Sequence, residues 1–161
     1  MDVTTPDVAE EKAQAAPDDV HAQIAAAYAC DAAGRQRAAL EYYRRAAHLG
    51  IPEGLDRPFM IQFGAALTQN GLWPEAIHVL QVALARWPEH RGLKCYLALA
   101  LHQGGHHDAA IGELLGVALS GCEHMPDLKP HAWDLAGWEA ELLMSAVNDH
   151  DGHLALEEIS T

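Results

Sequence analysis

Histidine is frequent among the side chains of this sequence that could do chemistry, with 11 copies in 161 residues. His102, His106 and His107 crowd into one predicted turn together with Asp108. Two histidines four residues apart on a continuous helix can share a metal ion, but Gly104–Gly105 interrupts the helix between His102 and His106. We therefore interpret this cluster as the polar surface of a turn and expect no metal site there.

A second spacing, near the C-terminal end, is similar to part of a calcium-binding EF-hand loop. Asp149, Asp151, Gly152 and Glu158 fall at positions of that loop. Val147 occupies the position of the first ligand, where calcium requires an oxygen donor. We expect no calcium binding.

The three cysteines, Cys30, Cys95 and Cys122, include no CxxC spacing. An odd number without that spacing disfavours both a disulfide framework and a four-cysteine zinc site. Cys30 and Cys95 lie among apolar residues of predicted helices, and no basic residue is spaced to activate either thiol. Because the sequence also lacks a glycine-rich phosphate loop, paired carboxylates and a nucleophile elbow, we predict a protein that is not an enzyme and uses no cofactor.

Charge is concentrated at the two ends of the sequence. The formal net charge is −13, of which residues 1–19 carry −5 and residues 123–161 carry −8, while residues 20–122 are neutral. An acidic chain without a basic stripe is a poor candidate for binding nucleic acid or an anionic membrane. No signal peptide is recognisable at the start, and even the longest apolar runs, such as 95–101, are too short to span a bilayer. We expect a soluble protein of the reducing cytoplasm.

Three similar segments predict the elements that carry these side chains. Each has a glycine, four residues, an alanine and an aliphatic residue, starting at Gly34, Gly71 and Gly105. Apolar residues at helical spacing precede and follow each glycine, and no stretch alternates as a strand does. The pattern predicts an all-α fold with helices near 19–32, 35–49, 57–70, 73–86, 91–103 and 107–120. The glycines are expected to end helices in the left-handed conformation, with Pro74 in a first helical turn and Pro88 after a last one.

These segments resemble the tetratricopeptide repeat (TPR) family. The stretch 57–90 matches best, with the pattern residues Met60, Phe63, Gly64, Leu67, Ala76, Leu80, Ala83 and Pro88. The stretch 91–124 departs at Lys94 and Cys122, and the stretch 20–53 is weaker and is followed by a three-residue insertion. The resemblance implies a right-handed superhelix of three antiparallel helical pairs. The composition, high in Ala, Arg and His, is similar to that of small bacterial TPR proteins of mostly unassigned function.

The expected domain organisation follows from these repeats. Residues 1–18 form an acidic, mostly flexible arm, in which 6–15 could make one short helix, residues 19–148 form the repeat domain, and 149–161 form an acidic flexible tail. A repeat array leaves an apolar face open at its end. We expect a capping helix near 130–147 to cover the third pair with Trp138 and Leu142, while Glu139 faces water.

The TPR resemblance also implies a concave groove lined by the first helix of each pair, in which a peptide or protein segment binds. Residue by residue, that groove would be lined by Ile24, Tyr28, Asp31, Ile61, Gln62, Ala65, Thr68, Gln69, Cys95, Tyr96, Leu99 and His102. No cation stands at the places where one TPR subclass grips a C-terminal carboxylate. We therefore expect a neutral, partly apolar groove.

The sequence-based hypothesis is a non-catalytic protein-binding scaffold that holds a peptide or helix segment through hydrophobic anchors. A homodimer or other self-assembly through the same surface is the alternative in a different class. Metal binding through the histidines is a third, less favoured hypothesis.

Overall fold

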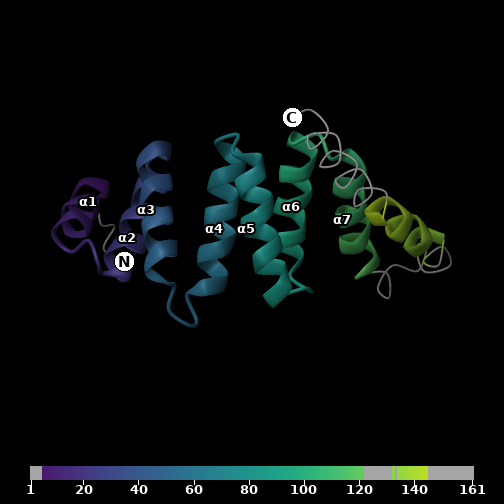
Figure 1. Ribbon diagram of the computed structural model, residues 1–161, viewed down its shortest axis with the longest axis horizontal. Coiled ribbons are helices and arrows are strands. Elements are labelled where there is room, and N and C mark those ends of the chain that lie inside the picture. The colour runs from purple at the N-terminus through teal and green to yellow at the C-terminus, as the bar shows by residue number, and fades with distance from the viewer. Residues whose placement is uncertain (1–4, 122–131, 133, 145–161) are drawn as a thin grey trace, which may run out of the picture. The chain divides into compact units, whose positions relative to one another are not determined.

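The computed structural model describes residues 5–121, 132 and 134–144, and every regular element in those ranges is an α-helix (Figure 1). The labelled helices are α1 (Pro6–Ala15), α2 (Val20–Ala32), α3 (Gln36–Leu49), α4 (Asp56–Gln69), α5 (Trp73–Arg86), α6 (Arg91–Gln103) and α7 (His107–Leu119). Residues 134–144 form a further helix. The all-α prediction is confirmed for this part of the chain, and α2 to α7 begin and end within one residue of their predicted bounds.

The chain divides into two compact units, Met1–Val79 and Leu80–Thr161, each of which is described by itself. In the first unit α1 packs on α2, α2 on α3 and α3 on α4. In the second unit α6 packs on α7. Three-residue turns join α2 to α3 and α6 to α7, and so short a connection makes neighbouring helices antiparallel.

The same glycine turn recurs in both units. Gly34, Gly71 and Gly105 have φ values of 72°, 72° and 89°, which confirms the expected left-handed conformation. The residue after each glycine donates its N–H to a carbonyl five residues earlier, in the pairs Arg35 to Cys30 (2.8 Å), Leu72 to Leu67 (3.0 Å) and His106 to Leu101 (2.8 Å). These bonds satisfy carbonyls that the helix end would otherwise leave unpaired.

Helix α1 lies within residues 1–18, the acidic arm that the sequence predicts to be mostly flexible. Its Ala9 and Ala13 are buried, and Gln23 of α2 donates from Nε2 to the carbonyl oxygens of Ala13 (2.8 Å) and Ala16 (3.3 Å). Gln23 thereby caps the C-terminal end of α1. The helix forms over the residues that the sequence allowed for one short helix, because the alanine face fits closely on α2.

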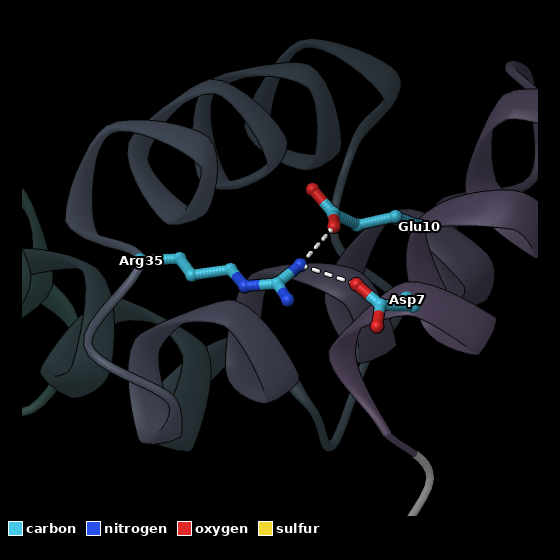
Figure 2. A network of polar contacts seen from close by, with 3 residues as sticks. All are labelled: Asp7, Glu10 and Arg35. Atoms are coloured by element: carbon cyan, nitrogen blue, oxygen red, sulfur yellow. Dashed lines mark hydrogen bonds and ion pairs between the residues drawn. The ribbon is translucent and has the colours of Figure 1, made fainter.

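The guanidinium group of Arg35 forms ion pairs with two acidic side chains of α1 (Figure 2). Arg35, in the turn before α3, points between Asp7 and Glu10 of α1, and its Nη1 lies 2.6 Å and 2.7 Å from their carboxylate oxygens. The two acidic side chains stand on the same face of α1, three residues apart. Part of the N-terminal negative charge is therefore paired within the fold.

Aromatic side chains form the core of the first unit. The fully buried ring of Tyr43 on α3 stacks on Phe63 at 5.4 Å between centroids, meets the edge of Phe59 at 5.6 Å, and lies 6.0 Å from Tyr28. Its hydroxyl donates to Oδ2 of Asp31 at 3.1 Å. Burial raises the pKa of Tyr43, and the neighbouring Asp31 carboxylate adds to the effect. This contact joins α2, α3 and α4 into one core.

The helix of residues 134–144 packs on α7 with a different face from the one predicted. A Cβ atom on Gly112 would lie 2.8 Å from Leu143, and one on Gly116 would lie 2.5 Å from Glu139. The prediction that Trp138 covers the third pair is wrong, because Trp138 is 66% exposed. Gly112 and Gly116 are one helical turn apart and form a strip of α7 without side chains, here called the glycine strip. Glu139 and Leu143, also one turn apart, lie against this strip.

Several sequence-based expectations concern residues outside the described ranges. They are the loop 122–130, both ends of the capping helix near 130–147, the EF-hand-like spacing of 147–158 and the acidic tail 149–161. Within the described ranges, no helix has the length and apolar character that crossing a membrane requires.

Candidate functional site

Helix α6 has one buried face and one exposed apolar edge. It follows the N-cap residue His90, whose Nδ1 accepts the N–H of Leu93 at 3.2 Å, and it ends at the Gly104–Gly105 turn. The buried face consists of Leu93, Leu97, Ala98, Ala100 and Leu101. The exposed edge consists of Cys95, Leu99 and His102, which are spaced by four and three residues and so lie along one line.

Helix α7 brings a second apolar edge to the first. Ala110, Ile111 and Leu114 lie on the side toward the exposed edge of α6, while Gly112 and Gly116 contact the helix of residues 134–144. That helix therefore leaves the space between the two apolar edges open. The φ of 89° at Gly105 reverses the chain so that α7 runs back along α6.

The two edges enclose an open groove, here called the α6–α7 groove. Its volume is about 330 Å³, and it is lined by Cys95, Ala98, Leu99, His102, Ala110, Ile111 and Leu114. Leu99, Ile111 and Leu114 are 46%, 50% and 50% exposed. Such a site offers apolar contact and a single imidazole at its edge, so it can bind hydrophobic side chains but holds no set of groups for bond-breaking chemistry.

Three of the four groove residues predicted in the second unit line this groove. They are Cys95, Leu99 and His102, all exposed. Tyr96, the fourth, is half-buried and does not line it.

In the first unit, the predicted groove residues differ in their exposure. Ile24, Ala65 and Thr68 are buried. Tyr28, Asp31 and Ile61 are half-buried, and Gln62 and Gln69 are exposed. Two of the polar side chains already have internal partners, because Thr68 donates to the carbonyl oxygen of Gly64 at 2.7 Å and Asp31 accepts from Tyr43. A common groove along the first helices of all three repeats stays a prediction.

Sequence reasoning missed the α7 side of the α6–α7 groove. The groove residues expected from the sequence all lie on the first helix of a pair, so Ile111 and Leu114 of α7 were not among them. The available signal was the pair of glycines at 112 and 116, one turn apart on α7. A glycine strip attracts a closely packed helix, and that helix then leaves Ile111 and Leu114 uncovered.

No cluster in the described ranges resembles a catalytic centre. Burial, with a further contribution from Glu10, raises the pKa of the Cys30 thiol to about 11, so this cysteine is a poor nucleophile. Cys95 is exposed in the α6–α7 groove, and Cys122 lies outside the described ranges. No three or more His, Cys, Asp or Glu side chains there are grouped so that they could hold a metal ion together.

Comparison with known protein families decides the nature of the repeat. A family model described as tetratrico peptide repeat matches residues 20–132, which is well over half of the chain. The chain belongs to the tetratricopeptide repeat family. No curated protein and no solved structure matches it significantly. The match begins at Val20, the first residue of α2, so α1 lies outside the matched residues. Repeat arrays of this kind present extended binding surfaces and serve in protein interactions.

Proposed function

We propose that this TPR protein is a non-catalytic interaction module whose α6–α7 groove binds an amphipathic helix of a partner protein. The observation that carries the proposal is the shared exposure of Leu99, Ile111 and Leu114 along one groove. Single exposed aliphatic residues are common on protein surfaces, whereas a contiguous group of them marks an interaction site.

The first repeat supports a helix as the occupant. The third repeat follows the first by 71 positions, so Tyr43 is the counterpart of Leu114. Tyr43 is covered by α4, which places Phe59 and Phe63, one helical turn apart, against its ring. A partner helix with two bulky apolar side chains at positions i and i+4 would cover Leu114 in the same manner.

The apolar area that a partner covers sets the expected affinity. Covering about 500 Å² of apolar surface contributes roughly 12 kcal/mol, most of which is offset by the loss of rigid-body freedom and by side-chain ordering. Micromolar binding is therefore expected.

Charge is expected to affect the association rate. Because the chain carries a net charge of −13, helices flanked by Lys or Arg should associate faster than acidic helices, and added salt should reduce this difference in rate.

A library of displayed helical peptides, selected on the wild-type chain, tests the proposal. Enriched peptides should carry apolar residues at i and i+4, and fluorescence anisotropy should give micromolar dissociation constants. Leu99→Glu and Ile111→Glu should each weaken binding by at least about tenfold, because a carboxylate would be buried without a partner.

Val82→Glu is the matched control. Val82 on α5 is also exposed and apolar, but it does not line the groove. Circular dichroism establishes first that all three variants fold. Equal affinities for wild type and Leu99→Glu, or a selection without binders, would contradict the proposal.

Self-association is a second candidate, favoured by one observation. On the helix of residues 134–144, Trp138 and Met144 are 66% and 69% exposed. Light scattering after gel filtration, over a range of concentrations, distinguishes the candidates. A dimer that is lost in Leu114→Glu would place a second copy in the groove and overturn the proposal of a partner helix. A dimer lost only in Trp138→Glu would leave the groove free for that helix.

A further inference from the structure

The turn between α6 and α7 brings together two histidines that sequence spacing did not pair. His102 lies in the last turn of α6, and His107 is the first residue of α7. Their Nδ1 atoms are 3.1 Å apart, and their ring centroids are 4.8 Å apart. The glycine break that separates His102 from His106 also reverses the chain, and this reversal carries His107 back to His102.

We propose that His102 and His107 form a binding site for a divalent transition-metal ion, with Zn²⁺, Ni²⁺ and Cu²⁺ as the ions that suit two imidazole ligands. Metal–nitrogen bonds of about 2.0–2.1 Å place two ligands of a square-planar or tetrahedral ion about 2.9–3.4 Å apart. The Nδ1 separation lies inside this range. One ion can therefore bind both rings with little movement of either helix.

The pair is organised before a metal arrives. A separation of 3.1 Å also suits a hydrogen bond between two neutral imidazoles, one of which donates its Nδ1–H to the other. Such a bond keeps the two Nδ1 atoms close together and facing each other. To bind the ion, the donor ring moves its proton from Nδ1 to Nε2, so both rings present a free Nδ1 and the total number of protons is unchanged.

The surroundings favour a cation with open coordination positions. Both histidines are exposed, so water can complete the coordination shell. Because His102 also lines the α6–α7 groove, the ion would sit at one edge of that groove. The proposal does not depend on partner binding, and it is tested without any peptide.

Calorimetric titration of the full chain with Zn²⁺ tests the site, with the exposed neighbour His106 as a matched control in the same turn. His102→Ala and His107→Ala should each weaken the wild-type affinity by about tenfold or more, since loss of an outer-shell group alone costs that much. His106→Ala should leave the affinity unchanged. An equal loss in His106→Ala would overturn the proposal.

Two further readouts separate this site from the other nine histidines of the chain. In nitrogen NMR spectra of the imidazoles, Zn²⁺ should shift the Nδ1 signals of His102 and His107 first. Saturating Zn²⁺ should also raise the melting temperature of wild type and His106→Ala by a few degrees more than that of His102→Ala, because the ion links α6 to α7. Unshifted Nδ1 signals, or equal melting shifts in all three proteins, would overturn the proposal.

Discussion

Side chains at equivalent positions of the first and third helical pairs differ in burial. Tyr43 and Leu40 on α3 are buried, whereas their counterparts on α7, Leu114 and Ile111, are half exposed. The turns that join the helices are nevertheless the same in dihedral angle and in hydrogen bonding. The repeat therefore determines where a side chain is placed, and the next helix determines whether it is covered.

The covering helices account for the difference. In the first pair, Phe59 and Phe63 of α4 pack on Tyr43. In the third pair, the helix of residues 134–144 lies on the glycine strip of α7 and leaves Leu114 half exposed. The same inter-helix space is thus core at one end of the chain and an open groove at the other.

The largest expected contrast is in stability. Tyr43→Ala should lower the free energy of unfolding by about 3–5 kcal/mol, because it empties the aromatic core, and Leu114→Ala should lower it by less than about 1 kcal/mol. Urea denaturation measures both. Tyr43→Phe, which keeps the ring and loses only the hydrogen bond to Asp31, should cost about 1 kcal/mol. Similar losses in the two alanine variants would mean that the third pair is covered after all.

The sequence predicted the helices of this fold well, because glycine and proline mark their ends. Gly34, Gly71 and Gly105 were assigned to turns, and Pro74 and Pro88 to the ends of α5, for reasons that depend only on backbone geometry. These are local properties, and no distant contact overrides them here.

Side-chain exposure was harder to predict, because it depends on which face of a helix is covered by the neighbouring helix. Trp138 is large and apolar and was expected to turn inward, yet close approach at Gly112 and Gly116 decided the orientation of its helix. Helix α1 gave only a weak signal, since its buried face consists of the small residues Ala9 and Ala13.

The next contrast concerns the thiols. Alkylation by iodoacetamide at pH 8, followed by peptide mass spectrometry, should modify exposed Cys95 at least about a hundred times faster than buried Cys30. The raised pKa of Cys30, about 11, slows its reaction further. Gln23→Ala, which removes the cap on α1, should accelerate the modification of Cys30 and leave that of Cys95 unchanged. Equal rates in the wild-type protein would show that α1 does not protect the first pair.

Filling the open groove should make the third pair more like the first. Leu114→Tyr places a ring at the position that Tyr43 has in the first repeat. This ring should lower the affinity for the selected helical peptides by about tenfold, a change of about 1.4 kcal/mol. Urea denaturation should show a stability within about 1 kcal/mol of wild type, because the site is open to solvent. Val82→Tyr is the control and should bind as wild type does. Unchanged affinity in Leu114→Tyr would mean that the peptides bind elsewhere.

The smallest effect is expected where the two pairs are alike. Gly34→Ala and Gly105→Ala should each cost about 1 kcal/mol, because both glycines have positive φ and an added Cβ would meet no atom within 4 Å. Backbone strain is then the only cost, and it is the same at both turns. Asparagine, which tolerates the left-handed conformation better, should recover part of the loss at each site. Two equal losses in urea denaturation would establish that the pairs share one turn and differ only in their covering helices. A clearly smaller loss at Gly105 would mean that the third pair relaxes its turn, and that its open groove reflects looser packing of the pair itself.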